Sequence, residues 1–281
     1  MVGSFTVKKI LNNNVIIATH SSYKEVVLIG KGIGFGKTSG SEITPNSAEK
    51  IFILKNEKDQ EHYKKLVSNI DEDIIGVMNE VIHHIKKRVH EPISEHIHIA
   101  LTDHIAFTIK RIEQGLEISN PFLIETKSLY PTEYDISKEV VSLLHDKLGV
   151  LLPEGEIGFI ALHIHSAITN KTISDVNQHS QLVTNLIKLI EDNLKIKINK
   201  DSVHYLRLIR HLRYTIDRVI SGETVEEPEK LALVLKEEYP LCYNLSWKVV
   251  KVMQQALRLP VYDAEAIYLT MHLQRLVNKS E

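Results

Sequence analysis

The chain has 281 residues, with 34 lysines and arginines against 36 aspartates and glutamates, so its formal net charge is −2. Apolar residues make up 43% and charged residues 25%, a balance that is typical of folded globular domains and argues against a disordered chain. The length predicts two or three domains. The single cysteine, Cys242, excludes a disulfide within the chain, a four-cysteine zinc site and an iron–sulfur cluster. The first residues lack the apolar core of a signal peptide, and the longest apolar run, 157–168, is too short to span a bilayer, so we expect a cytoplasmic protein.

Both the net charge and the spacing of apolar residues change near residue 58. Residues 1–60 hold eight lysines and five acidic residues, a net charge of +3, which leaves −5 for the rest of the chain. Short β-branched runs alternate with turn-forming residues in this basic segment and predict four antiparallel strands, around 5–7, 15–17, 26–29 and 51–54. Because so small a sheet buries little surface, we expect it to dimerise through one face.

Beyond residue 58 the apolar period becomes helical. A long amphipathic helix is predicted between residues 63 and 85, with a bend near Asp71 or Gly76. The further predicted helices cover 94–115, 134–148, 154–169, 179–195, 201–221, 227–238, 245–257 and 262–278. The fold class is therefore a small all-β domain followed by all-α helical bundles.

The helical part contains an internal repeat. The stretch from His104 to Arg111, followed by a glycine, matches the stretch from His211 to Arg218 at an offset of 107. Further on the offset becomes 109, so that Tyr130-Pro matches Tyr239-Pro. At the same offset the segment 156–163, which ends in His163, matches 265–272, which ends in His272. Two homologous all-helical domains are therefore expected, each with a matched pair of histidines.

The matched residues share helix faces, because positions i, i+4 and i+7 lie on one stripe. Each repeat offers two histidines, a threonine, an arginine and a glutamate: His104, Thr108, Arg111, Glu156 and His163 in the first, and His211, Thr215, Arg218, Glu265 and His272 in the second. Imidazole is nucleophilic at neutral pH, arginine can bind phosphate oxygens, and a carboxylate can orient the ring. The pattern therefore suits a transferable phosphoryl group.

Two other interpretations of these histidines stay open. Some of the 15 histidines can be duplicated core residues without a function of their own. A metal site is the other alternative. However, His96-x-His98 and His163-x-His165 lie in segments predicted to be helical, where the side chains of residues i and i+2 point in different directions, and the HExxH motif is absent.

A glycine-rich basic loop follows the third predicted strand. The segment from Gly30 to Thr38 fails both the Walker A and the GxGxxG spacing and precedes no helical run, which argues against nucleotide binding. Its lysines and Phe35, together with the triple-asparagine turn at 12–14, suit phosphates and an unpaired base, so they indicate RNA or single-stranded nucleic acid. The alternative is that both segments are ordinary hairpin turns.

Together these segments resemble the BglG/SacY-type transcriptional antiterminators, and most closely the glucose-operon type. The resemblance rests on the order of the 9–16 segment, the 30–37 loop, Leu-Thr-Asp-His104 and Gly-Phe-Ile-Ala-Leu-His163, and it covers essentially the whole chain. It implies a dimeric four-stranded co-antiterminator RNA-binding domain at 1–58. Two phosphotransferase-system (PTS) regulation domains would follow at 59–172 and 173–281.

The resemblance also implies a mechanism and partners. The sheet would stabilise a hairpin in a leader transcript, so that an overlapping terminator cannot form. A sugar-specific enzyme II would phosphorylate the first regulation domain and disfavour the active dimer, and the phosphocarrier HPr would act on the second in many members. No enzymatic activity, cofactor or metal is implied. The competing hypothesis is a histidine phosphotransfer enzyme or metal-dependent enzyme with an accessory strand domain.

Carried over by position, the RNA contacts would be Lys9, Asn12, Asn14, Gly30, Lys31 and Phe35, and the phosphorylation sites would be His104, His163, His211 and His272. The supporting residues would be Arg111, Arg218, Glu156 and Glu265. The chain departs from the family pattern at three places. Lys31 stands where many members have arginine, Gly34 and Gly36 replace larger residues, and Arg210 precedes His211 where Asp103 precedes His104.

Overall fold

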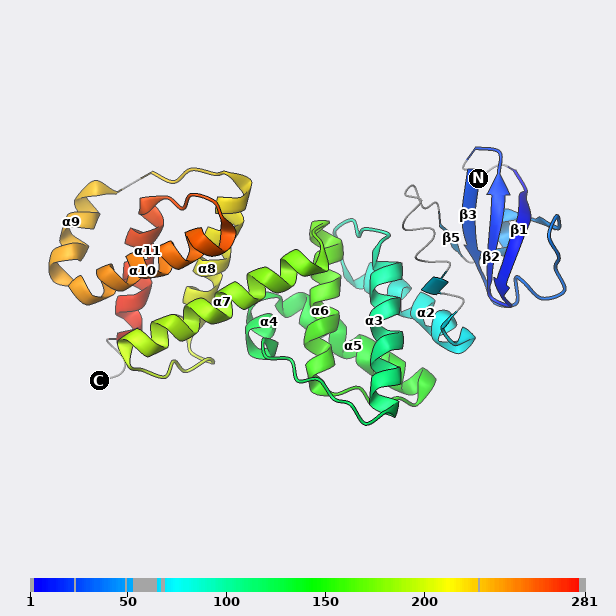
Figure 1. Ribbon diagram of the computed structural model, residues 1–281, viewed down its shortest axis with the longest axis horizontal. Coiled ribbons are helices and arrows are strands. Elements are labelled where there is room, and N and C mark those ends of the chain that lie inside the picture. Colours follow the sequence, from blue (N-terminus) through cyan, green and yellow to red (C-terminus); the bar gives the residue numbers. More distant parts are fainter. Residues whose placement is uncertain are drawn as a thin grey trace. The chain divides into compact units, whose positions relative to one another are not determined.

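The computed structural model describes residues 3–22, 24–48, 50–52, 65–66, 69–226 and 228–277 (Figure 1). The chain forms two compact units. The first contains Met1–Ile118, Ile136–Glu156 and Ala167–Asn170, and the second contains Ser119–Asp135, Ile157–Ser166 and Lys171–Glu281. The domain boundaries at 58/59 and 172/173 stay a prediction, and the first of them lies outside the described residues.

The first unit begins with an antiparallel sheet in the order β4-β1-β2-β3-β5. Its strands are β1 (Phe5–Asn12), β2 (Val15–His20), β3 (Lys24–Ile29), β4 (Glu42–Ile43) and β5 (Lys50–Phe52). Strands β1, β2, β3 and β5 confirm the four predicted strands, although Ile53 and Leu54 lie outside the described residues. The two-residue β4 pairs with the start of β1 and was not predicted, because it is too short to show alternation.

Both faces of this sheet are buried at β2 and β3, where runs of β-branched and leucine residues occupy successive positions, whereas β1 alternates buried and exposed residues at its start. One face packs within the sheet domain, around Phe5, Ile16 and Leu28. On the other face, Val15, Val27 and Ile29 cluster with apolar side chains of the helical part of the unit, namely Leu66, Ile75 and Ile99. Apolar surface that the sequence suggested for a dimer contact is thus partly buried within the chain. Dimerisation itself stays a prediction.

The helices of the structure are α2 (Glu72–Arg88), α3 (Ile97–Glu113), α4 (Leu123–Leu129), α5 (Pro131–Leu148), α6 (Glu154–Thr169), α7 (Ile173–Leu194), α8 (Val203–Ser221), α9 (Glu229–Glu238), α10 (Pro240–Leu257) and α11 (Asp263–Val277). The all-α character of this part is confirmed. The bend predicted near Asp71 is instead a helix start, where the Asp71 carboxylate accepts a hydrogen bond from the Asp73 N–H.

Most differences from the predicted helices are at their starts. Helix α7 begins at Ile173 because Thr172 and Asp175 form a capping box, which extends the helix six residues beyond its strongly apolar part. Helices α5 and α10 begin at a proline, which is tolerated in the first turn. The seven-residue α4 is too short for a clear period, and the sequence did not predict it.

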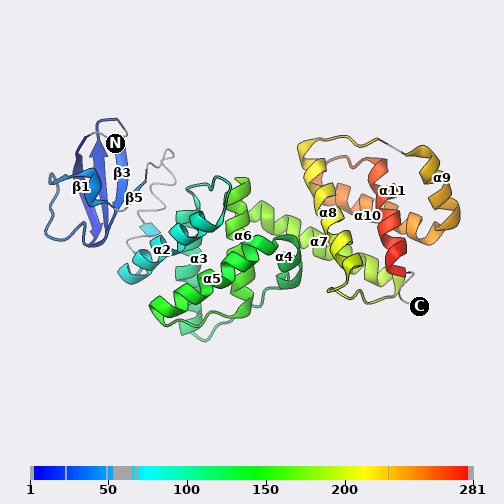
Figure 2. The same ribbon diagram turned by 180° about the vertical axis from the view of Figure 1, so that it is seen from behind.

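The second unit is built around one apolar core from α7, α8, α10 and α11. Helix α11 lies against both α8 and α10, as Figures 1 and 2 show from opposite sides. Leu129, Tyr130 and Leu162, which belong to the first sequence repeat, complete this core. Within the described ranges, no helix is long and apolar enough to cross a membrane.

Candidate functional site

Two loops lie side by side at one end of the sheet: the turn 12–14 between β1 and β2, and the glycine-rich loop 30–36 after β3. Three hydrogen bonds from glycine amides join them. The Gly30 N–H donates to the Asn14 carbonyl at 3.0 Å, the Gly34 N–H to the Asn13 carbonyl at 2.8 Å, and the Gly32 N–H to Asn14 Oδ1 at 2.8 Å. The structure therefore brings the two predicted nucleic-acid-binding segments together.

Glycine is required at three positions of this loop, for two different reasons of backbone geometry. Gly32 and Gly36 adopt positive φ angles of 67° and 65°, which side-chain-bearing residues rarely adopt. At Gly34 the constraint is close approach, because a Cβ atom there would lie 2.5 Å from the Asn12 carbonyl oxygen. Between these glycines Ile33 is buried in the sheet core, while the Phe35 side chain is 77% exposed. The loop thus fixes one apolar side chain and presents the next to solvent.

The asparagines of the turn are also constrained. Asn12 Oδ1 accepts a hydrogen bond from the Asn14 N–H at 2.9 Å, which closes an Asx turn. Asn12 Nδ2 is buried and has no hydrogen-bond partner within the part of the chain that the structure describes. Lys9, on β1, and Lys31, in the loop, have exposed side chains. Asn12, Asn14, Gly30, Lys31 and Phe35 therefore belong to one loop pair, and Lys9 lies on the strand that leads into it.

In the first helical repeat, three residues of one α3 stripe converge on Glu156 of α6. His104 Nε2 lies 2.9 Å from Glu156 Oε2, the Thr108 hydroxyl donates to the same oxygen at 3.3 Å, and Arg111 Nη2 donates to Oε1. The Glu156 carboxylate is fully buried, so these donors replace its water. His163 lies on α6, two helical turns after Glu156, and is half-buried.

Two opposing effects set the charge of this carboxylate. Burial alone would raise the pKa of Glu156, but the hydrogen bonds and charges of His104 and Arg111 outweigh it and hold the pKa below its usual value. The first repeat therefore keeps a buried, ionised carboxylate next to the His104 ring.

The second repeat builds the same arrangement from α8 and α11. The Thr215 hydroxyl donates to Glu265 Oε2 at 2.7 Å, and Arg218 donates from Nε to Oε1 and from Nη2 to Oε2, both at 2.9 Å. His211 Nε2 is farther away, 4.0 Å from Glu265 Oε2. Its ring instead stacks on that of His272, with the centroids 4.6 Å apart. The two histidines of this repeat are therefore direct neighbours.

Both rings are uncharged at neutral pH. Burial lowers the pKa of His211 to about 3, together with the repulsion that a protonated His211 would meet from a protonated His272 and from the Arg218 guanidinium. Burial and the nearby Arg275 and Arg207 also lower the pKa of His272. A neutral imidazole has a free lone pair, which a nucleophile requires.

The histidines that the sequence suggested as metal ligands make other contacts in the structure. His98 Nε2 lies 3.4 Å from Glu95 Oε2, and His165 Nδ1 lies 2.9 Å from Glu133 Oε1, whereas His96 is exposed at the N-cap of α3. Among the residues that the structure describes, no group of three or more histidine, cysteine or acidic side chains is arranged to hold a metal ion.

One neighbour of the loops was not predicted from the sequence. Glu72, at the first position of α2, accepts a hydrogen bond from the Asn13 N–H at 3.2 Å. Its place next to the turn arises from tertiary packing over 59 residues, for which the sequence holds no signal.

The comparisons with known proteins agree with this architecture. Residues 5–61 match the model of the CAT RNA binding domain, and residues 79–167 and 184–276 each match the model of the PRD domain. The PtsGHI operon antiterminator of Bacillus subtilis (strain 168) is 60% identical over 279 residues, which are 99% of each chain. The chain belongs to the GlcT-type antiterminators.

Other GlcT-type antiterminators are similar over their whole length. The GlcA/glcB genes antiterminator of Staphylococcus carnosus (strain TM300) is 41% identical over 100% of this chain and 98% of its own. A solved structure, the crystal structure of GlcT CAT-PRDI, is 61% identical, with a TM-score of 0.55, and covers 60% of this chain and 100% of its own. The loop pair falls in the CAT match, His104 and His163 in the first PRD match, and His211 and His272 in the second.

Proposed function

We propose that this chain binds a hairpin in the leader RNA of a sugar-uptake operon and thereby prevents a transcription terminator from forming. The names of its relatives point to glucose as the sugar. The observation that carries the proposal is the hydrogen-bonded loop pair, in which Asn14 receives two glycine amides of the facing loop. Such a pair presents amides, lysines and an aromatic ring together, as recognition of a bulged RNA requires.

The loop pair has a role for each residue. Lys9 and Lys31 bind backbone phosphates, and the exposed Phe35 ring stacks on an unpaired base. Asn12 and Asn14 contact base edges; the Asn12 Nδ2 donor is buried and without a partner among the described residues, so it reaches a base acceptor only when the turn opens on binding. Gly30 keeps the loop backbone close to the turn, through its bond to the Asn14 carbonyl.

Control is proposed to come from phosphorylation of His104, His163, His211 and His272. A PTS donor, a sugar-specific enzyme II or HPr, transfers its phosphoryl group to a ring nitrogen, so that a P–N bond forms as the bond to the donor breaks. Arg111 and Thr108 in the first repeat, and Arg218 and Thr215 in the second, bind the phosphoryl oxygens.

Because each glutamate is buried beside a histidine, a phosphoryl group on that histidine would change how the helices pack. A phosphoryl group on His104 would place negative charge beside the Glu156 carboxylate, which the ring now contacts at 2.9 Å. The hydrogen bond would be lost and the two anions would repel each other, so α3 and α6 would have to shift. In the second repeat Glu265 is 4.0 Å from His211, and Arg210 precedes this histidine where Asp103 precedes His104, so we expect a different donor or rate there.

The remaining parts of the proposal concern the whole chain. The domains are 1–58, 59–172 and 173–281, the active form is a homodimer, and the chain works in the cytoplasm, where leader transcripts are made. It is a regulator without catalytic turnover. The competing proposal, a phosphotransfer or metal-dependent enzyme, would instead require continuous release of phosphate or product.

The test of RNA binding is a salt titration with the full chain. Wild type and the Asn12→Ala/Asn14→Ala variant are measured against a bulged leader hairpin and a fully paired RNA, with Asn46→Ala, an exposed asparagine of the same domain, as control. We expect wild type and Asn46→Ala to prefer the bulged hairpin and to lose affinity steeply with salt. The double variant should lose at least about tenfold in affinity. Equal binding of both RNAs by wild type would contradict the proposal.

A further inference from the structure

Helix α4 belongs to the first sequence repeat, yet it packs on α8 of the second through a buried carboxylate. Glu125 of α4 is only 1% exposed. Its Oε1 atom accepts hydrogen bonds from Lys200 Nζ at 2.7 Å and from the Tyr205 hydroxyl at 3.2 Å. Tyr205 is itself fully buried, and its pKa is raised by burial and by the charge of Glu125. A buried carboxylate requires such partners, so this contact is specific in position and direction.

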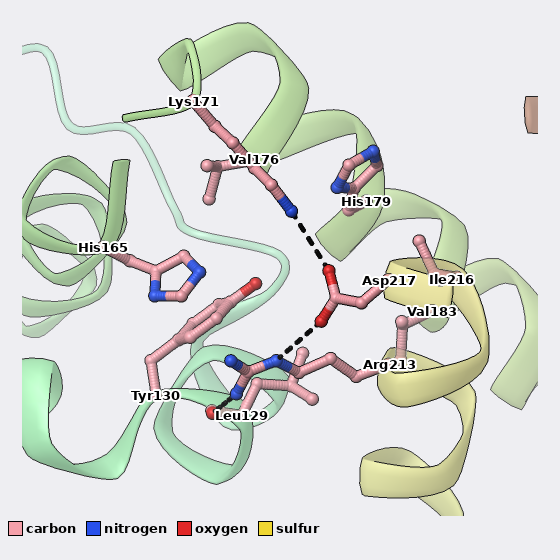
Figure 3. A pocket seen from close by; sticks show the side chains of 10 residues that line it. All are labelled: Leu129, Tyr130, His165, Lys171, Val176, His179, Val183, Arg213, Ile216 and Asp217. Carbon is pink, nitrogen blue, oxygen red and sulfur yellow. Dashed lines mark hydrogen bonds and ion pairs between the residues drawn. The ribbon is translucent and has the colours of Figure 1, made fainter. Parts of the chain in front are cut away.

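A second contact holds the other end of α4. Arg213 of α8 donates from Nη1 to the Leu129 carbonyl at 2.6 Å, and its guanidinium lies 4.9 Å from the Tyr130 ring centroid (Figure 3). Asp217, one turn further along α8, lies between Arg213 and Lys171 and keeps the arginine in place. Arg213 therefore satisfies a carbonyl at the C-terminal end of α4, where helices leave carbonyl groups unpaired.

The internal repeat shows that these contacts are special to this junction. At the offset of 107, Tyr205 corresponds to His98 and Arg213 to Ala106. Glu125 corresponds to Ala232 or Val234, according to where the offset changes to 109. The general helical fold is common to both repeats, but the residues that join α4 to α8 are not repeated: the equivalents of Glu125 and Arg213 are apolar, and the equivalent of Tyr205 is His98, which lies 3.4 Å from Glu95 of its own repeat. Their purpose is therefore the junction and not the fold of a single repeat.

Helix α8 carries two different functions on two sides. Tyr205 and Arg213, eight residues apart, lie on the side that packs against α4. His211, Thr215 and Arg218 lie on the roughly opposite side, where the last two bind Glu265. A change on one side that shifts α8 therefore also alters the contacts on the other side, because a helix of 19 residues moves largely as a unit.

We propose that α8 couples the phosphorylation site of the second repeat to the docking of α4, through the Glu125–Lys200–Tyr205 and Arg213–Leu129 contacts. The proposal rests on the proposed function in one respect, namely that His211 or His272 receives a phosphoryl group. Negative charge added at His211 repels Glu265, displaces α8 and changes how firmly α4 is held. By thermodynamic reciprocity, loosening α4 changes the equilibrium constant for phosphorylation of His211 by the same factor.

The docking contacts are tested by hydrogen exchange on the full chain. Lys200→Met removes the charge partner of Glu125 and keeps the aliphatic stem, and Lys197→Met, an exposed lysine of the same loop, is the matched control. We expect amides of 123–130 and 203–213 to exchange at least about tenfold faster in Lys200→Met, with the sheet amides of 15–29 unchanged. Unchanged exchange in α4 would overturn the docking role. If exchange rises throughout the chain, the variant is unfolded, and Tyr205→Phe, which removes one hydroxyl, decides by the same criterion.

The coupling is tested with a charge at His211. The full chains of His211→Asp and of the neutral His211→Gln are compared with wild type, before and after incubation with a phosphodonor. We expect exchange in 123–130 to differ at least threefold between the Asp and Gln variants, and to change on phosphorylation of wild type. Equal exchange in both variants would overturn the coupling. If mass spectrometry finds no phosphorylated wild type, the proposed function fails, while the Asp–Gln difference still decides the coupling.

Discussion

At the residue scale, the two repeats use the same residue types with different geometry. His104 contacts the buried Glu156 directly, whereas His211 stacks on His272 and lies farther from Glu265. The sequence repeat identified His104 with His211 and Glu156 with Glu265, but the distance between histidine and glutamate differs by about one ångström, and His211 contacts a second imidazole instead of the carboxylate. Burial of the stacked His211 ring therefore makes the second repeat sensitive to pH.

We predict that His211 makes the chain less stable in mild acid. Its pKa is about 3 in the folded chain, because of burial first and then nearby positive charge, against about 6.5 when unfolded. The unfolded chain therefore binds the extra proton as pH falls below 6.5, and stability is lost progressively from there toward pH 3. Between pH 7.5 and 5.5 the loss from this group is about 1.4 kcal/mol.

Urea unfolding of wild type and His211→Gln over this pH range checks the prediction. The glutamine variant cannot bind the proton, so its stability should fall less by that amount. His90→Gln, an exposed histidine outside the repeats' matched stretches, is the control and should follow wild type. Parallel pH curves for wild type and His211→Gln would contradict the burial of the His211 ring.

At the element scale, the proposed RNA contact depends on how two strands end. The turn after β1 and the loop after β3 meet because β2 and β3 pair in register from Val15↔Ile29 to His20↔Lys24, which brings the asparagine turn opposite the glycine loop. Close backbone approach at Gly34 then allows the glycine amide to reach the Asn13 carbonyl. This element-level fit makes glycine at position 34 a requirement of the loop pair.

We predict that Gly34→Ala separates the loops, because its Cβ atom would lie 2.5 Å from the Asn12 carbonyl oxygen. Affinity for the leader hairpin should fall at least about tenfold, since the amide and asparagine contacts are displaced together. Gly40→Ala is the control: Gly40 has a φ of 89° but open space around its Cβ position, so it should cost about 1–2 kcal/mol of stability. Its RNA affinity should be close to that of wild type. Equal RNA affinity of Gly34→Ala and Gly40→Ala would show that the loop pair is not the RNA contact.

At the scale of the whole molecule, α2 contacts the candidate RNA-binding loops, and α4 is part of the unit that contains the His211 site. Glu72 of α2 reaches the asparagine turn, and α4 of the first repeat completes the core of the second unit. Both contacts cross the domain boundaries that composition and the internal repeat predict. The three-domain division therefore stays a prediction from the sequence, and these contacts join residues on opposite sides of its boundaries.

We predict that Glu72→Gln strengthens RNA binding by the full chain. The Glu72 carboxylate accepts from the Asn13 amide at 3.2 Å and places negative charge beside loops that approach RNA phosphates. Removing that charge should raise affinity by up to about fivefold at low salt, with the gain lost at high salt. Glu80→Gln, an exposed glutamate of the same helix that pairs with Lys147, is the control. Weaker binding by Glu72→Gln than by Glu80→Gln would mean that the carboxylate supports the turn more than it repels RNA.

The sequence by itself determined the elements and the residue types of the sites. Period-two and period-3.6 patterns record which face each element buries, so β1, β2, β3, β5 and most helices could be predicted, with starts shifted by a few residues where caps and prolines replace apolar residues. The repeat identified the histidine, arginine and glutamate sets, because duplicated helices keep equivalent spacings. The glycine loop was recognisable because Gly32 and Gly36 adopt positive φ angles that other residues rarely adopt, and the asparagine turn because asparagine side chains readily close Asx turns.

Only the tertiary structure decided which of these residues meet. The bonds between the asparagine turn and the glycine loop, the stacking of His211 on His272, the approach of Glu72 and the docking of Glu125 on α8 all join residues distant in sequence. Local periodicity holds no information on such pairs, because it reports burial and not the identity of the neighbour. Helix α4 shows the limit most clearly: seven residues are too few for a period, and its position is set by a carboxylate whose partners lie about 75 to 80 residues away.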